Sequence, residues 1–133
     1  MRPDLFVMMR WGGVQLRYEW LDGELLAMPG VEKDFKVEWQ WVRYMICGKM
    51  FAATLTDGEG HAVVSLKLDP LEGEFLRSQY PDIAPGYYMN KRHWNSIHLD
   101  GAFPDDLLRA LARKSYRLVL EGLTKKQRES IGI

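Results

Sequence analysis

The chain has 133 residues, of which 47% are hydrophobic and 27% charged, a composition typical of one soluble globular domain and not of a disordered or fibrous segment. Eighteen basic and eighteen acidic side chains give a formal net charge of zero, which excludes the strong overall field of a highly basic or acidic protein. The single cysteine, Cys47, excludes an internal disulfide and favours a reducing cytoplasm. No apolar run near the start is long enough for a signal core or a membrane span, so we expect no membrane partner.

The start of the chain gives one weak and one clear signal. Residues 1–14 lack clean periodicity, and we expect them to form a loosely ordered extension of a single domain covering residues 1–133. A helix is predicted within Gln15–Met28, because apolar residues recur there at helical spacing, and Pro29-Gly30 should end it.

Three strands are predicted next, after a polar stretch, Val31–Glu38, to which no element is assigned. Trp39–Cys47 and Lys49–Thr56 are rich in aromatic and β-branched residues, and we expect them to form a hairpin that turns at Cys47-Gly48. Beyond a second turn, apolar residues alternate in Ala62–Leu68, which indicates a third antiparallel strand.

A second helix is predicted to begin after Asp69, which is followed by proline and then by an acidic residue at the third helical position. Its apolar face should carry Leu71, Phe75 and Leu76. The helix should end by Tyr80, because Pro81 disfavours helical geometry in the residue before it.

The remaining elements are two short strands, near Tyr87–Met89 and Trp94–Leu99, and a last long helix from Pro104 to Gly122. The apolar stripe of this helix should carry Leu108, Leu111, Ala112 and Val119. The order α-β-β-β-α-β-β-α predicts an α+β fold. It should be a two-layer α/β sandwich, in which an antiparallel sheet is covered by helices on one face.

The densest polar cluster is the segment from Tyr87 to Asn95, where adjacent cations, amides, an imidazole and aromatic rings fall within nine positions. Cations can neutralise phosphates, amides can contact bases, and rings that face solvent can stack on bases. The alternative is a structural loop whose rings belong to the core and whose cations are merely solvated.

Charge is uneven along the chain: residues 1–85 hold nine basic and thirteen acidic side chains, and residues 86–133 hold nine basic and five acidic ones. Arg109, Arg113 and Arg117 share one stripe of the last helix. This stripe is either a basic binding face or the ordinary charged exterior of a soluble helix.

Catalytic and metal sites are not predicted. His93, His98 and Asp100 are the most compact set of potential metal ligands, but the two histidines would point to opposite faces of a strand. Cys47 has no neighbouring base in the sequence, and no serine has the context of a nucleophile. We therefore expect no metal and no cofactor.

Several segments together resemble the MmcQ/YjbR family of small bacterial proteins. The resemblance runs from about Tyr18 to Arg128 and rests above all on Met89-Asn90-Lys91-Arg92-His93-Trp94-Asn95-Ser96. Further support comes from Gly48–Ala52, Leu66–Pro70 and Pro104–Leu108. It implies a two-layer domain of the CyaY-like or secretion-chaperone-like type, and DNA binding of the double-wing kind. Trp39 and Trp41 depart from the family pattern.

We therefore expect a non-enzymatic protein that binds DNA through a basic surface by phosphate contacts. The residues expected to bind nucleic acid are Asn90, Lys91, Arg92, His93, Lys125, Lys126 and Arg128. The alternative is an interaction module or chaperone-like adaptor, in which the open sheet face or an exposed strand edge, with Trp39, Trp41 and Tyr44, holds a peptide, a protein or a second copy of the chain.

Overall fold

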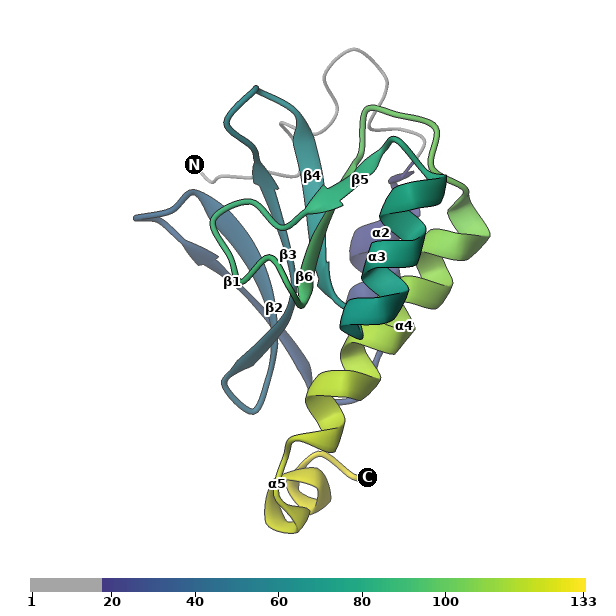
Figure 1. The fold of residues 1–133 in the computed structure, drawn as a ribbon. Coiled ribbons are helices and arrows are strands. Elements are labelled where there is room, and N and C mark those ends of the chain that lie inside the picture. Colours follow the sequence, from purple (N-terminus) through teal and green to yellow (C-terminus); the bar gives the residue numbers. More distant parts are fainter. Residues whose placement is uncertain (1–17) are drawn as a thin grey trace.

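The computed structural model describes residues 18–133, and Figure 1 shows an antiparallel sheet with helices packed against one of its faces. The strands lie in the spatial order β1-β2-β3-β4-β6-β5. In chain order the elements are α2 (Trp20–Leu26), β1 (Val31–Lys36), β2 (Trp41–Ile46), β3 (Lys49–Thr56), β4 (Ala62–Lys67), α3 (Pro70–Gln79), β5 (Ile83–Pro85), β6 (Trp94–His98), α4 (Asp105–Glu121) and α5 (Lys125–Ser130). The predicted α+β class, with helices on one face of an antiparallel sheet, is confirmed.

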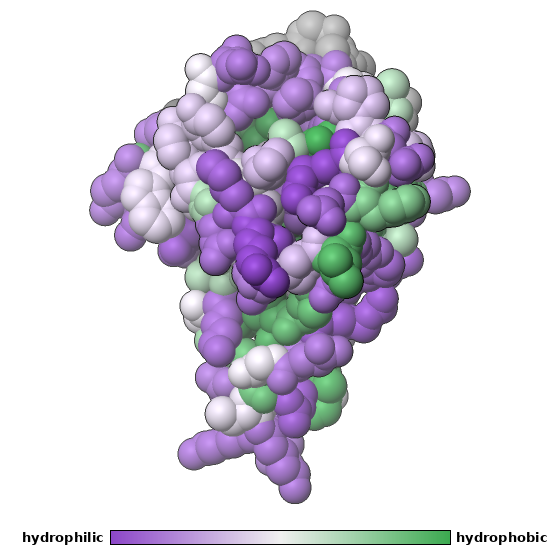
Figure 2. Space-filling model, viewed as in Figure 1, coloured by the Kyte–Doolittle hydropathy of each residue, from purple (hydrophilic) through white to green (hydrophobic). Residues whose placement is uncertain are grey.

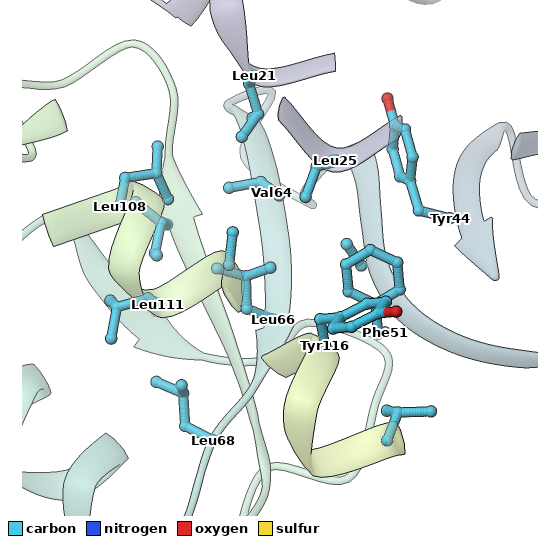
Figure 3. Packing of buried hydrophobic residues seen from close by; sticks show 14 of the residues in the cluster. Leu21, Leu25, Tyr44, Phe51, Val64, Leu66, Leu68, Leu108, Leu111 and Tyr116 are labelled. Atoms are coloured by element: carbon cyan, nitrogen blue, oxygen red, sulfur yellow. The ribbon is translucent and has the colours of Figure 1, made fainter. Parts of the chain in front are cut away.

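The main core lies between the sheet and the helices. Val64 and Leu66 of β4 point toward α4, and Leu108 and Leu111 of α4 meet them from the other side (Figure 3). Because strand side chains alternate between the two faces, Val63 and Ser65 of β4 fall on the opposite face. We call this second side the open face of the sheet.

A buried hydroxyl joins α4 to the sheet. Ser115 donates from Oγ to the backbone oxygen of Phe51 at 2.6 Å and accepts from the backbone N–H of Lys67 at 2.8 Å. Phe51 and Tyr116 pack edge to face beside it, with ring centroids 5.5 Å apart. The long helix is therefore fixed by polar as well as apolar contacts.

The predicted turns and caps are largely confirmed. The backbone at Cys47 and Gly48 has φ of 48° and 79°, as a two-residue hairpin of the primed type requires. Asp69 caps α3 by accepting from the N–H of Leu71. The helix ends before Tyr80, as predicted.

The predicted apolar face of α3 is wrong. Leu71 is 76% exposed and Phe75 61% exposed, whereas Leu76 is buried. The helix turns Gly73 toward the sheet, where a Cβ would lie 3.0 Å from the Asn95 side chain. The close approach of the helix backbone to the buried Asn95 side chain decides this orientation. Figure 2 shows the hydrophobic side chains that are left on the surface over α3.

Two elements were missed and one was misplaced. Val31–Lys36, taken as a polar stretch without structure, is edge strand β1, and charged residues on such a strand guard it against pairing with other chains. Lys125–Ser130 is helix α5, which begins with a capping box between Thr124 and Gln127. The strand predicted near Tyr87–Met89 lies earlier, at Ile83–Pro85, and Tyr87–Met89 is part of a loop.

The first predicted helix is shorter than expected, because α2 covers only Trp20–Leu26. The extension predicted for residues 1–14 lies outside the described residues. Among residues 18–133, none of the helices has the length and apolar character needed to cross a bilayer.

Candidate binding site on the open face of the sheet

The polar segment singled out in the sequence forms a loop across the open face. This β5–β6 loop, residues 86–93, is fastened at its two ends: the N–H of Gly86 donates to the oxygen of Trp94 at 2.7 Å, and the N–H of Leu68 donates to the oxygen of His93 at 2.8 Å. Asn90 closes a turn inside the loop, because its Oδ1 accepts from the N–H of Arg92 at 2.9 Å. The loop is therefore an ordered structure built on the sheet.

The middle of the loop covers a small apolar cluster. Met89 packs against Trp41 and a few small or aliphatic side chains of the open face. Those side chains are Ala53, Leu55 and Val63. The loop thus covers this cluster on the open face.

A groove of about 700 Å³ lies beside this apolar cluster. It is lined by Glu38, Trp39, Trp41, Met50, Tyr88, Met89, Asn90 and Trp94, and we call it the aromatic groove. Tyr88 is 67% exposed and Trp39 52% exposed, whereas Trp41 is buried. Trp39 leans on Trp41, with ring centroids 4.9 Å apart and planes tilted by 59°. Two large rings thus face solvent on one surface.

Two cations lie beside the ring of Trp39. The Lys36 Nζ lies 5.2 Å and the Arg43 guanidinium carbon 5.9 Å from the ring centroid of Trp39. Arg43 is also paired with Asp34 through two hydrogen bonds of 2.8 and 2.7 Å. The hydrogen bonds from this guanidinium hold the pKa of Asp34 below its usual value. The Arg43 charge is thus compensated within the protein.

The loop cations are less constrained. Lys91 donates from Nζ to the backbone oxygen of Gly86 at 3.0 Å and lies 5.9 Å from the ring centroid of Tyr87. Arg92 is exposed, and within residues 18–133 its guanidinium makes no hydrogen bond or ion pair. Neither cation is paired with a described carboxylate, so both charges face solvent. His93 is half-buried beside them.

The C-terminal cations predicted for the same site lie on α5, which projects beyond the end of α4 and away from the loop (Figure 1). Lys125 and Lys126 are exposed, whereas Arg128 donates to the backbone oxygen of Leu123 at 2.6 Å. A direct role for these three residues stays a prediction.

The arginine stripe of α4 belongs to the helix layer, on the other side of the sheet from the loop. Arg113 pairs with Glu24 of α2 at 2.5 Å, and Arg109 lies 3.7 Å from the same carboxylate and 4.1 Å from the ring centroid of Trp20. Lys114 pairs with Glu72 of α3. Two of the three arginines in this stripe therefore link α4 to α2. This favours the interpretation of the stripe as the ordinary charged exterior of a soluble helix.

The nucleophile candidates have structural contacts. Cys47 is half-buried at the hairpin turn, with Sγ 3.8 Å from the backbone oxygen of Gln127. Ser65 and Ser96 share a buried hydrogen bond of 2.8 Å between their hydroxyls.

The alternative function involves Trp39, Trp41 and Tyr44, and the structure separates these residues. Trp39 and Trp41 line the aromatic groove, whereas Tyr44 is buried in the main core, where its hydroxyl donates to Asp22 at 2.7 Å. Glu38 and Met50 are not predicted from the sequence, because the β1–β2 turn and strand β3 bring them to the loop only in the folded sheet.

Comparison with known proteins shows to which family this chain belongs. The model of the YjbR family matches residues 26–118. This chain belongs to the YjbR family. The protein YjbR of Escherichia coli K12 is 32% identical over 104 residues, which cover 78% of this chain and 87% of the relative. The protein YbdF of Escherichia coli O157:H7 is 33% identical over 106 residues, covering 80% and 86% of the two chains.

Solved structures agree with the fold of this YjbR-family protein. The crystal structure of Deinococcus radiodurans protein DR2400 superposes with a TM-score of 0.75 at 35% identity, covering 85% of this chain and 86% of the other. A crystal structure of a Pseudomonas syringae protein has a TM-score of 0.59 at 23% identity, with 66% and 86% covered, and shows the fold alone. The family match contains the β5–β6 loop and the aromatic groove and ends before α5.

Proposed function

We propose that this protein is a non-enzymatic nucleic-acid-binding protein that holds a single strand of DNA or RNA on the open face of its sheet. The observation that carries the proposal is that the exposed rings of Trp39 and Tyr88 share one groove with the loop that bears Lys91 and Arg92. Bases stack on exposed aromatic rings with about 1–3 kcal/mol each, and cations along the groove neutralise phosphates.

The single strand is favoured over duplex DNA by the charge and by the shape of the surface. The formal net charge is zero, and two arginines of α4 are paired with Glu24, so the broad basic surface that a duplex backbone needs is lacking on that helix. Stacking in the groove requires the free face of an unpaired base. A strand that enters the groove gains contacts that a duplex cannot make.

Asn90 and His93 supply polar contacts in this proposal. The Oδ1 of Asn90 is occupied by the N–H of Arg92, which leaves its Nδ2 at the rim of the groove to donate to a base or a phosphate. Glu38 also lines the groove, and Lys36 lies 3.9 Å from its carboxylate and offsets its charge.

The test is a titration with a short oligothymidylate, followed by quenching of tryptophan fluorescence at several salt concentrations. Lys91→Ala combined with Arg92→Ala should reduce the slope of log binding constant against log salt by about 1.4, because each phosphate contact to a single strand contributes about 0.7. Tyr88→Ala should weaken binding about 5- to 150-fold and leave the slope unchanged, since a stacking contact is worth about 1–3 kcal/mol.

The matched control is Lys125→Ala combined with Lys126→Ala, which removes the same charge from α5. The sequence predicts a role for these two lysines, but α5 projects away from the loop (Figure 1), so we propose that they lie outside the path of the strand and that this control binds like the unaltered protein. An equal fall of the slope in both double variants would contradict the loop as the site, as would binding that prefers a duplex of the same length.

A second candidate function is the capture of a peptide or protein in the same groove, and the methionines favour it. Met50 and Met89 line the groove together with Glu38, and flexible methionine side chains suit surfaces that bind varied apolar partners. The sheet edges are less suited, because β1 carries Glu32, Lys33 and Asp34 and β5 is three residues long and ends in proline. This candidate would be favoured if light scattering showed a homodimer whose mass does not change with salt concentration, and if the protein did not bind the oligothymidylate.

A further inference from the structure

A second polar cluster lies at the end of the sheet where β4 begins and β6 ends. His61 precedes β4, His98 is the last residue of β6, and Asp100 follows in the next turn. The Nδ1 of His61 lies 2.7 Å from Asp100 Oδ2, and the two imidazole rings are stacked with centroids 4.5 Å apart. One nitrogen or oxygen from each of these three residues lies within 4.8 Å of the other two.

The backbone holds the three residues in place. The N–H of His98 donates to the oxygen of Asp82 at 2.8 Å, and the N–H of Leu99 donates to the oxygen of Ala62 at 2.8 Å. The N–H of His61 donates to the Oδ1 of Asp57 at 2.9 Å. Hydrogen bonds across neighbouring segments therefore preorganise the cluster.

The cluster has an excess of negative charge. Asp57 Oδ2 lies 3.8 Å from His98 Nε2, and Asp82 Oδ1 lies 4.0 Å from His98 Nδ1. Within residues 18–133, no lysine or arginine pairs with Asp57, Asp82 or Asp100. The local field favours a positive charge at this position.

His98 is the side chain whose bonding is least complete. Both of its ring nitrogens lie at 3.8 Å or more from the nearest described carboxylate oxygens, too far for a hydrogen bond, although the side chain is only 23% exposed. A partly buried imidazole without a hydrogen bond is free to bind a ligand.

We propose that His61, His98 and Asp100 bind a divalent transition-metal ion of the zinc type. Two imidazole nitrogens and one carboxylate oxygen form a donor set suited to Zn²⁺, and three protein ligands leave a fourth position open to water. The nitrogen of His98 that does not bind the ion would face one carboxylate, Asp57 beside Nε2 or Asp82 beside Nδ1, and both carboxylates help to balance the charge. His93, which the sequence groups with His98 and Asp100, is not part of this cluster, because the fold brings His61 to its place.

Binding requires rotations of the ligand side chains. Tetrahedral zinc with bonds of about 2.0–2.1 Å brings its ligand atoms to about 3.3 Å from one another, and the three present atoms lie up to 4.8 Å apart. The stacked rings must turn about their side-chain bonds so that their nitrogens converge. His61 and Asp100 have exposed fractions of 38% and 37% and can turn without disturbing the core. The ion replaces the proton that now joins them.

The experiment is calorimetric titration of the untagged protein with Zn²⁺ at pH 7.5, followed by addition of Co²⁺ to a metal-free sample. We expect one saturable site and a visible Co²⁺ spectrum of tetrahedral intensity. His61→Ala, His98→Ala and Asp100→Asn should each weaken Zn²⁺ binding by about 10- to 100-fold or more.

The control is His93→Ala, which removes the one histidine of the chain that lies outside the cluster and leaves the cluster intact. It should bind Zn²⁺ like the unaltered protein. Equal weakening by His93→Ala, unchanged binding by the cluster variants, or no saturable binding would each overturn the proposal. Thermal melts without metal show whether each variant folds. The outcome does not depend on the proposed nucleic-acid site, since Zn²⁺ binding is measured without oligonucleotide and the three cluster variants leave Asn90, Lys91, Arg92 and His93 intact.

Discussion

The two faces of the sheet bury their apolar residues to different extents. On the helix-covered face, three helices seal a continuous core in which Leu25, Leu66 and Leu108 have no exposed surface (Figure 3). On the open face, one loop seals a cluster around Trp41 and leaves Trp39 and Tyr88 in contact with solvent. The first face stabilises the fold, whereas the second keeps exposed aromatic surface that the fold does not need. This difference locates the candidate function.

The largest difference between the faces should be seen with leucine replacements. Leu66→Ala, in the sealed core, should lower the free energy of unfolding by about 2–5 kcal/mol, because it leaves a cavity between β4 and α4. Leu71→Ala, on the exposed side of α3, is the matched control and should change it by less than about 0.5 kcal/mol. Urea unfolding followed by circular dichroism measures both. Equal losses would show that the described packing is wrong.

A glycine replacement tests how the loop is held on the open face. A Cβ at Gly86 would lie 2.7 Å from the Cβ of Trp94 and 3.0 Å from its backbone carbon, so Gly86→Ala must shift the loop. We expect a loss of about 1–3 kcal/mol of stability, together with weaker oligothymidylate binding. Gly23→Ala, in α2 where an added Cβ would meet nothing within 4 Å, should instead stabilise the protein by up to about 1 kcal/mol.

Removing an exposed ring should separate function from stability on the open face. Trp39→Ala loses the contact with Trp41 and should cost about 0.5–1.5 kcal/mol of stability. Oligothymidylate binding should fall about 5- to 150-fold, as expected for one stacked base. Unchanged binding with a normal melt would exclude Trp39 from the site.

The smallest effect concerns the ion pair at the border of the open face. Arg43 holds the pKa of Asp34 below its unfolded value, so the pair stabilises the fold at any pH above about 4. This contribution is lost as the pH falls through the pKa of the folded state. Because Asp34 is half exposed, we expect less than about 1 kcal/mol. In acid unfolding, Asp34→Asn should remove this part of the pH dependence, and an unchanged profile would contradict it.

Much of the fold could be predicted because its signals are local. The cap at Asp69, the turn at Cys47-Gly48 and the apolar stripe of α4 each depend on neighbours within a few residues, and all three are confirmed. Strand β1 was missed because only Val31 and Phe35 of this edge strand pack against the core, and the charged Lys33 between them interrupts the alternation of a half-buried strand. Leu71 and Phe75 were misassigned because helical spacing defines a stripe but not the direction in which it points.

The candidate sites depended on long-range contacts to different degrees. The segment Asn90–His93 was found from its composition, because its cations and rings are adjacent in the chain. The groove needed Trp39 and Met50, and the metal cluster needed His61 beside Asp100, which the chain separates widely.

The sequence by itself determined the α+β class, most element boundaries and the family, since local hydrogen bonding and the periodicity of apolar residues are enough to specify them. Only the tertiary structure decided which charges are compensated, which rings face solvent and which histidines meet. These properties follow from the register of strands and the packing of helices, which bring together side chains with no relation in the sequence.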